Sequence, residues 1–172
     1  MYPIRLGRTD ELEQLRNIEV QAGVIFAEHG MSEIAEDEPF SVEVLTSYCS
    51  DGRLWVATDE NDRPVGYIIV DALDQSAHIE QVSVDPDFAG KRIGQALIDK
   101  SIEWAIGRGY TAMTLTTFQD VPWNAPYYQR LGFEVLPERD WSDDLVRIRS
   151  EEATHGLDRW PRVCMHKALA RT

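Results

Sequence analysis

The segment 82–97, with the sequence VSVDPDFAGKRIGQAL, constrains the fold more than any other part of the chain. It opens in an alternating apolar pattern typical of a strand, which Asp85-Pro86-Asp87 ends. Gly90 and Gly94 follow, and the pattern after them is helical. The first turn of a helix has backbone N–H groups without partners in the helix, and glycines let an anion approach them. The segment therefore predicts a strand, a phosphate-binding loop and a helix in succession.

Two common phosphate loops do not fit this segment. The nucleotide P-loop ends in Gly-Lys-Ser/Thr, and the dinucleotide fingerprint has three glycines at fixed spacing. Residues 89–94, AGKRIG, instead resemble the QxxGxG/A loop that binds the acyl-CoA pyrophosphate in the GNAT superfamily of N-acyltransferases, and the Val-x-Pro that usually precedes it stands at 84–86. Ala89 stands where the family prefers Gln or Arg, and Arg92 where it prefers the first glycine. A residue other than glycine disfavours positive φ, so Arg92 leaves the loop geometry open.

A second stretch, residues 121–135, has the sequence VPWNAPYYQRLGFEV. Its pattern predicts a short helix that Asn124 caps and that ends at Leu131-Gly132. The spacing of Asn124, Tyr128 and Gly132-Phe133 resembles the GNAT pattern as well. The resemblance therefore rests on two separate motifs between residues 79 and 136.

The resemblance implies an α/β fold (α+β in some schemes), in which a mixed, largely antiparallel sheet with a parallel central pair is flanked by helices. The residue pattern itself predicts that a strand over 112–117 pairs in parallel with the strand over 78–84 through a right-handed crossover. Further strands are expected over 2–6, 54–58, 64–73, 133–135 and 162–169. Helices are expected from Asp10 to Gly30 with Thr9 as its cap, from Ser41, over 93–107, and over 142–156 with Ser142 as its cap, and residues 33–38 are expected to form an acidic loop.

The chemistry of amine acylation points to three candidate catalytic residues. An amine must lose a proton before it attacks a thioester, and the departing thiolate must gain one. Tyr128 stands in the family's position for the acid, and a phenol with a pKa of ~10 stays protonated at neutral pH. Strand alternation places Glu80 and His78 on one face as candidate bases. Each has a structural alternative, since Tyr128 can be a core aromatic, Glu80 can bind backbone or arginine, and His78 can be a hydrogen-bonded core histidine.

The resemblance also implies where acetyl-CoA, the acyl donor, would bind. The pantetheine arm would lie beside the end of the strand as an added strand on the main chain of 82–84. Loop N–H groups and the charges of Lys91 or Arg92 would hold the pyrophosphate, and Asn124 is either a CoA contact or a helix cap. The expected cofactor-binding residues are Val82, Ser83, Val84, Gly90, Lys91, Arg92, Ile93, Gly94, Gln95 and Asn124, and no metal is expected.

Bulk properties agree with one domain over residues 1–172, because 43% hydrophobic residues can form one core. The net charge of −13 opposes binding to nucleic acid and fits either a cationic acceptor or simple solubility. No apolar run is long enough to span a bilayer, and Cys49 and Cys164 lack the spacing of a disulfide framework or zinc site. We therefore expect a cytoplasmic protein without membrane contact, and exposed sheet edges permit a homodimer.

The resemblance implies an enzyme that transfers an acetyl group from acetyl-CoA directly to a primary amine in a ternary complex. Neither cysteine stands where the family pattern would make it a nucleophile, which disfavours an acyl-enzyme. The acceptor, a small molecule or a peptide amine, is expected to bind between Phe26–Ser41 and Asp140–Trp160, with Trp141 and Trp160 as lining residues. The alternative is a non-catalytic acyl-CoA-binding sensor or interaction module, which the altered glycine loop favours.

Overall fold

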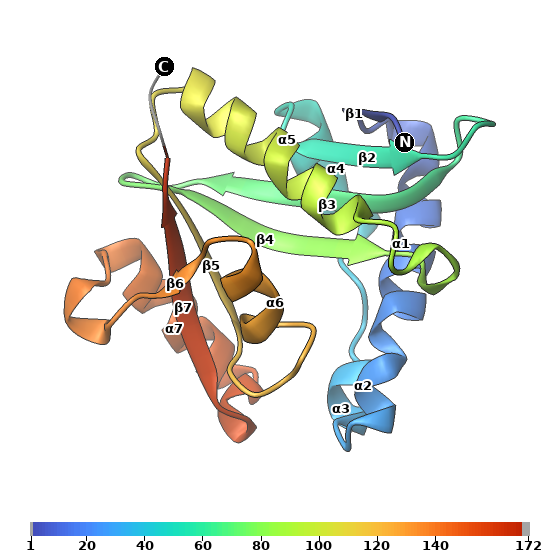
Figure 1. The fold of residues 1–172 in the computed structure, drawn as a ribbon. Helices are drawn as coiled ribbons and strands as arrows, with labels where there is room; N and C mark the ends of the chain where they lie inside the picture. The colour runs from blue at the N-terminus through green and yellow to red at the C-terminus, as the bar shows by residue number, and fades with distance from the viewer. Residues whose placement is uncertain (1, 170–172) are drawn as a thin grey trace. The chain divides into compact units, whose positions relative to one another are not determined.

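The structure, a computed structural model, describes residues 2–169 and places seven strands in one sheet (Figure 1). The strand order is β1-β2-β3-β4-β5-β7-β6. β4 and β5 are parallel, as predicted, whereas β1–β2, β2–β3, β5–β7 and β6–β7 are antiparallel pairs. The mixed, largely antiparallel sheet that the resemblance implied is thus confirmed. The strands are β1 (Ile4–Leu6), β2 (Leu54–Thr58), β3 (Pro64–Ala72), β4 (Ala77–Val84), β5 (Ala112–Phe118), β6 (Glu134–Val135) and β7 (Arg162–Ala168).

Seven α-helices flank the sheet within the described residues: α1 (Leu12–Gly23), α2 (Ile25–Glu28), α3 (Ser32–Ala35), α4 (Val42–Ser50), α5 (Ile93–Gly107), α6 (Ala125–Arg130) and α7 (Asp143–Thr154). The Ser41 and Ser142 hydroxyls cap α4 and α7 by accepting the N–H of Val44 and Leu145, which confirms those predictions. No helix among residues 2–169 has the length and apolar character needed to cross a membrane.

The first predicted helix is wrong in detail. Thr9 caps nothing, because it begins a 3-10 turn (Thr9–Glu11) in which the N–H of Arg8 donates to the Glu11 carboxylate at 2.8 Å. The helix then breaks after Gly23, where a glycine precedes the β-branched Val24 and Ile25, all poor helix formers. The predicted acidic loop at 33–38 begins as part of α3 instead.

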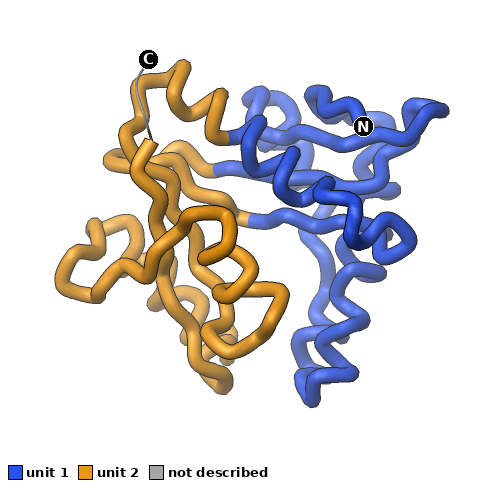
Figure 2. Tube along the Cα trace, viewed as in Figure 1, with its two compact units in different colours: residues 1–70, 81–101 blue, residues 71–80, 102–172 orange. Residues whose placement is uncertain are grey.

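The chain divides into two compact units, which Figure 2 colours separately. Unit 1 comprises residues 1–70 and 81–101, and unit 2 comprises residues 71–80 and 102–172. The change from one to the other within β4 falls between Glu80 and Gln81. The prediction that residues 1–172 form one domain stays a prediction.

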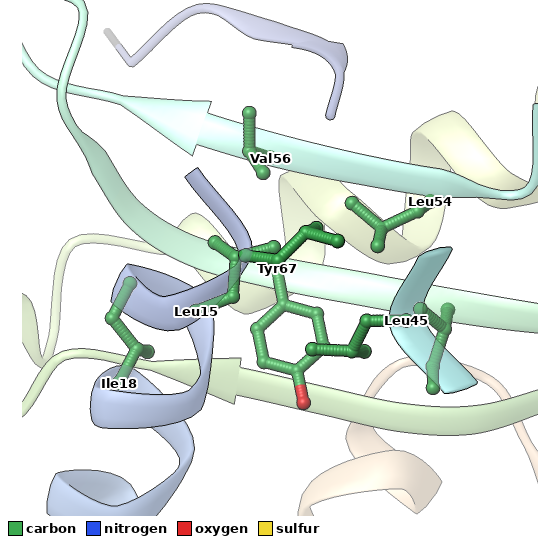
Figure 3. Packing of buried hydrophobic residues seen from close by; sticks show 8 residues of the cluster. Leu15, Ile18, Leu45, Leu54, Val56 and Tyr67 are labelled. Carbon is green, nitrogen blue, oxygen red and sulfur yellow. The ribbon is translucent and has the colours of Figure 1, made fainter. Parts of the chain in front are cut away.

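The core of unit 1 lies between the α1 and α4 helices and one face of β2 and β3. The register pairs Leu54 with Ile69 and Val56 with Tyr67, so these four side chains share a face. Figure 3 shows the Tyr67 ring among the aliphatic side chains of the helices. Its hydroxyl donates to a Glu19 carboxylate oxygen at 2.7 Å, which satisfies the one polar atom of that ring. The helical residues of this core, Leu12, Leu15, Ile18 and Leu45, are buried.

The opposite face of β3 receives the first turns of α5. A Cβ built on Gly66 would lie 3.0 Å from the Ser83 carbonyl oxygen and 3.3 Å from side-chain atoms of Ile93 and Leu97. Gly66 therefore lets the strands and α5 approach closely, which fixes where α5 begins. This approach matters because the predicted phosphate loop directly precedes α5.

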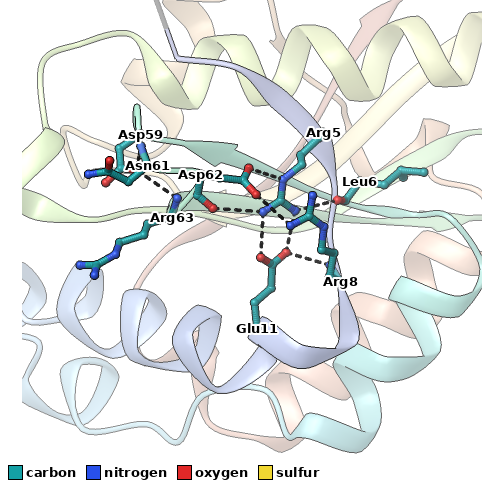
Figure 4. A network of polar contacts seen from close by, with 8 residues as sticks. All are labelled: Arg5, Leu6, Arg8, Glu11, Asp59, Asn61, Asp62 and Arg63. Carbon is teal, nitrogen blue, oxygen red and sulfur yellow. Dashed lines mark hydrogen bonds and ion pairs between the residues drawn. The ribbon is translucent and has the colours of Figure 1, made fainter.

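The edge of unit 1 is held by a polar network at the β2–β3 turn (Figure 4). Arg5 donates from Nε to Asp62 at 2.9 Å and from Nη1 and Nη2 to Glu11, also at 2.9 Å. Arg8 donates to the second Asp62 oxygen at 2.8 Å. The predicted polar turn between β2 and β3 thus ties β1 and the entry to α1 to its tip.

In unit 2, two helices cover opposite faces of the sheet. β5 lies between β4 and β7. Thr116 on one face of β5 bonds to Glu152 of α7. On the other face of the sheet, the Lys167 ammonium donates to the Leu131 carbonyl at the end of α6. The α7 face of this unit consequently carries polar side chains.

Candidate active site

The loop between β4 and α5 contains two left-handed residues in unit 1. Gly90 has φ +77° and Arg92 has φ +61°. A residue with a Cβ disfavours positive φ, yet Arg92 adopts it, at a cost of roughly 1–2 kcal/mol. The substitution at the glycine position therefore leaves a left-handed backbone in place.

The start of α5 offers backbone donors. The Arg92 carbonyl accepts the first helical hydrogen bond, from the N–H of Ala96 at 3.1 Å, so the N–H groups of Ile93, Gly94 and Gln95 belong to the first turn. That turn contains no acidic residue, and Lys91 and Arg92 are exposed beside it. A Cβ placed on Gly90 would meet nothing within 4 Å. This arrangement fits a pyrophosphate, whose oxygens accept hydrogen bonds from N–H groups and favour a helix N-terminus.

β4 extends beyond the segment that pairs with β5. The register with β5 covers Ala77–Ile79, whereas β4 runs on to Val84. The main chain of Val82, Ser83 and Val84 lies in this extension, and the Ser83 hydroxyl accepts a hydrogen bond from the Gln81 amide at 2.8 Å. An extended ligand that offers amide groups could add to such a segment as another strand.

Glu80 lies in unit 2 among other carboxylates. It directly follows the paired Ile79, and its side chain is on the α7 face with His78. Burial raises the pKa of Glu80 to about 8, and the negative charges of Asp71 and Glu152 act in the same direction, against the Arg162 guanidinium. Near pH 8 this carboxyl group can therefore either accept or release a proton.

His78 is held in a buried chain of hydroxyl groups. Its Nδ1 lies 2.8 Å from the Thr114 Oγ1, which lies 3.1 Å from the Ser76 Oγ. Burial lowers the pKa of His78, although the charges of Asp71 and Glu152 oppose this. The imidazole is therefore neutral at neutral pH, and its hydrogen bond to Thr114 orients the ring.

Tyr128 lies on α6 in unit 2 and packs edge-on to two aromatic rings. The ring centroids are 5.3 Å from Tyr127 and 6.0 Å from Phe133. Burial raises the pKa of Tyr128, and the neighbouring Tyr127 adds to this. The hydroxyl stays protonated at neutral pH, which is the state that an acid needs.

Asn124 stands at the N-cap position of α6, but its side chain makes no capping hydrogen bond. The side-chain cap predicted from the sequence is therefore wrong. Its backbone supplies the contacts instead, because its carbonyl accepts from the Tyr128 N–H at 3.0 Å and its N–H donates to Val121 at 2.9 Å. The part of Asn124 in binding CoA stays a prediction.

Sequence reasoning missed the residues that surround Glu80, namely Asp71, Glu152 and Arg162. Asp71 stands next to the last residue of an apolar strand, a position at which a carboxylate is a usable signal. Arg149 and Glu152 are three apart on α7, as in an ordinary surface ion pair. Of the two predicted lining residues, Trp141 lies under the Arg149 guanidinium at 5.9 Å and Trp160 packs edge-on to Phe118 at 6.1 Å.

Comparison with known proteins identifies the family. The model of the acetyltransferase (GNAT) family matches residues 12–133, well over half of the chain. The chain therefore belongs to the GNAT acetyltransferase family.

Three relatives illustrate the similarity. An uncharacterized N-acetyltransferase of Methanocaldococcus jannaschii is 38% identical over 81 residues, which are 43% of this chain and 36% of that protein. The peptidyl-lysine N-acetyltransferase YjaB of Salmonella typhimurium is 25% identical over 143 residues, 83% of this chain and 90% of the relative. The crystal structure of the PaiA N-acetyltransferase of Thermoplasma acidophilum in complex with coenzyme A superposes with a TM-score of 0.67 at 16% identity, covering 98% of this chain and 99% of that one.

Proposed function

We propose that this chain transfers an acetyl group from acetyl-CoA to a primary amine by direct attack within a ternary complex. The observation that carries the proposal is Glu80, a carboxyl group whose pKa of about 8 suits it to take a proton from an ammonium group. The left-handed loop, with its first-turn N–H groups and adjacent cations, supports binding of the donor's pyrophosphate.

Each side chain has a proposed role defined by the proton that it accepts or donates. Ionised Glu80 removes a proton from the acceptor ammonium, which frees the nitrogen lone pair. Bound acetyl-CoA supplies the thioester: the nitrogen–carbon bond forms, the carbon–sulfur bond breaks, and its electron pair goes to sulfur. Tyr128 then donates its hydroxyl proton to that sulfur. The nitrogen loses its second proton as the amide forms, and this proton restores the Tyr128 hydroxyl, while Glu80 returns the first proton to solvent. His78 is buried and its ring is held by the hydrogen bond to Thr114. We therefore give it a structural role on this face of β4 and no proton transfer.

The donor site is tested first. A ligand that binds only the folded state raises the apparent stability by mass action. We expect acetyl-CoA and CoA to raise the melting temperature and ATP at the same concentration to leave it unchanged. No shift with either CoA species would contradict the proposed donor.

Catalysis is tested separately from binding. With acetyl-CoA bound, release of free CoA in the presence of a panel of primary amines distinguishes an enzyme from a non-catalytic sensor. We expect amine-dependent release by the native chain and a loss of roughly a hundredfold or more in Glu80→Gln. Binding of acetyl-CoA without release by any amine would favour the sensor.

A further inference from the structure

The carboxyl group of Glu80 lies beside that of Asp71 within unit 2. Their strands, β4 and β3, are neighbours in the sheet, and the N–H of Leu73 donates to the Ser76 carbonyl at 3.0 Å across the short turn that joins them. Asp71 stands on β3 two residues before Leu73, and a side-chain hydrogen bond joins it to Glu80. Its charge also acts on His78, which shares the α7 face of β4 with Glu80. Two adjacent strands of one compact unit therefore hold these carboxyl groups together.

A hydrogen bond between two carboxyl groups requires a proton on one of them, because ionised carboxylates only accept. The Glu80 hydroxyl is the donor, since burial and the charge of Asp71 raise the pKa of Glu80 to about 8. The Asp71 carboxylate is then the acceptor. Two like charges in direct contact oppose each other's ionisation, so the pair holds one proton and one negative charge at neutral pH.

The other charges near the pair come from α7, β7 and the segment between them. Glu152 of α7 and Arg162 of β7 act on Glu80 by charge, in opposite directions. Arg162 Nη2 donates to Glu152 at 3.2 Å, and Arg149 Nη1 donates to Glu152 at 3.1 Å and to Asp158 at 3.0 Å. Two guanidinium groups and two carboxylates therefore balance one another here. The titratable groups next to this network, His78 and Cys164, are neutral at neutral pH, because burial lowers the pKa of the imidazole and raises the pKa of the thiol.

We propose that Asp71 is a positioning residue that shares one proton with Glu80, so that the two carboxyl groups act together as the base. The inference rests on the proposed acetyl transfer and adds a residue to its mechanism. When both groups are ionised, Glu80 takes a proton from the acceptor ammonium, and the electron pair of the N–H bond stays on nitrogen. The new Glu80 O–H then donates to the Asp71 carboxylate, which stabilises the protonated base. Asp71 thus makes Glu80 a stronger base and acts only through it.

The pH profile of kcat, from CoA release at saturating acetyl-CoA and amine, tests the role of Asp71. Asp71→Asn removes the charge at nearly constant size, so Glu80 ionises at lower pH and becomes a weaker base. We expect the midpoint of the profile to fall from about 8 by about 1–2 pH units. The plateau should fall roughly threefold to tenfold, while KM for acetyl-CoA stays unchanged. Asp71→Ser removes the same charge with a smaller side chain and should shift the midpoint likewise, whereas Asp71→Glu should keep it nearer the native value.

A second measurement reports the ionisation of Glu80 without any substrate. The pH dependence of urea unfolding is compared between Asp71→Asn and the double variant that also carries Glu80→Gln, and between the native chain and Glu80→Gln. The difference between the first two curves should reach its midpoint about 1–2 pH units below that between the second two. Asp74→Asn is the matched control, because Asp74 is an exposed aspartate of the same turn, and its midpoints should equal the native ones.

The outcomes separate this inference from the proposed function. If Asp71→Asn and Asp71→Ser lower kcat but leave both midpoints at the native pH, Asp71 is only structural, so the inference is wrong and acetyl transfer stands. An equal shift in Asp74→Asn would show an effect of overall charge and would also overturn it. If no amine releases CoA from the native chain, the proposed function itself fails, and the inference with it.

Discussion

Replacing Glu80 by glutamine should remove most of the pH dependence of stability near neutral pH. The carboxyl group of Glu80 has a pKa of about 8 in the folded chain, against an ordinary value of 4.5. Between these values the folded chain holds a proton that the unfolded chain releases, so folding is favoured at low pH and loses this contribution as the pH rises towards 8.

The expected change in the free energy of unfolding follows from the pH interval below the folded-state pKa of Glu80. From pH 6 to the folded-state pKa of about 8, the free energy of unfolding should fall by about 1.4 kcal/mol per pH unit, roughly 3 kcal/mol in all. Asp71 and Glu152 keep this pKa high after burial, and Arg162 opposes them. His78 acts in the opposite direction at the acid end of this range, because burial lowers its pKa and the unfolded imidazole takes up a proton that the buried one does not. The native chain and the variant share this effect, and the glutamine side chain is uncharged and nearly isosteric, so the difference between their curves isolates Glu80.

Urea unfolding at several pH values between about 6 and 8.5 measures the effect, with the slope m checked for constancy. Glu13→Gln is the control, since the Glu13 side chain is 72% exposed. Relative to Glu80→Gln, the native chain and the control should lose roughly 3 kcal/mol over this range. Parallel curves for all three proteins would refute the account of a buried, carboxylate-crowded Glu80.

Three further changes test other parts of the structure. Tyr128→Phe should lower kcat by about a hundredfold without changing acetyl-CoA affinity in calorimetry, and unchanged turnover would remove Tyr128 from the mechanism. Gly66→Ala should lower the free energy of unfolding by about 1–3 kcal/mol, because its Cβ would lie 3.0 Å from the Ser83 carbonyl, and a neutral effect on urea unfolding would contradict that close approach. Arg92→Gly should stabilise the chain by about 1 kcal/mol, by relieving its left-handed backbone, yet weaken acetyl-CoA binding severalfold by removing a cation. Stronger binding in this variant would exclude Arg92 as a phosphate contact.

Much of the fold could be predicted because its elements have strong local patterns. β2 and α5 have the predicted bounds, since a short apolar run before a polar turn marks the first and the helical spacing from Ile93 marks the second. The parallel β4–β5 pair followed from the helix between the strands. The segment before α4 was predicted less well, because Gly23 and the β-branched residues after it break the helix at a place that the apolar spacing does not show.

The candidate site could be predicted only where one element carries it. Glu80 and His78 share the α7 face because they alternate on one strand. The environment that sets their pKa values comes from β3, α7 and β7, and no local pattern links Asp71, Glu152 and Arg162 before the chain folds. Arg92 could not be predicted for a different reason: an arginine disfavours the left-handed conformation that the surrounding loop imposes on it.

The pH dependence of kcat tests the central claim most directly. The native chain and Glu80→Gln are compared at saturating acetyl-CoA with the acceptor amine that turns over fastest, and the acetylated amine is quantified by mass spectrometry. The account predicts that native turnover rises with pH to a plateau, with a midpoint near the Glu80 pKa of about 8, and that Glu80→Gln is about a hundredfold slower and lacks this rise. Native turnover and an unchanged pH profile in Glu80→Gln would contradict it.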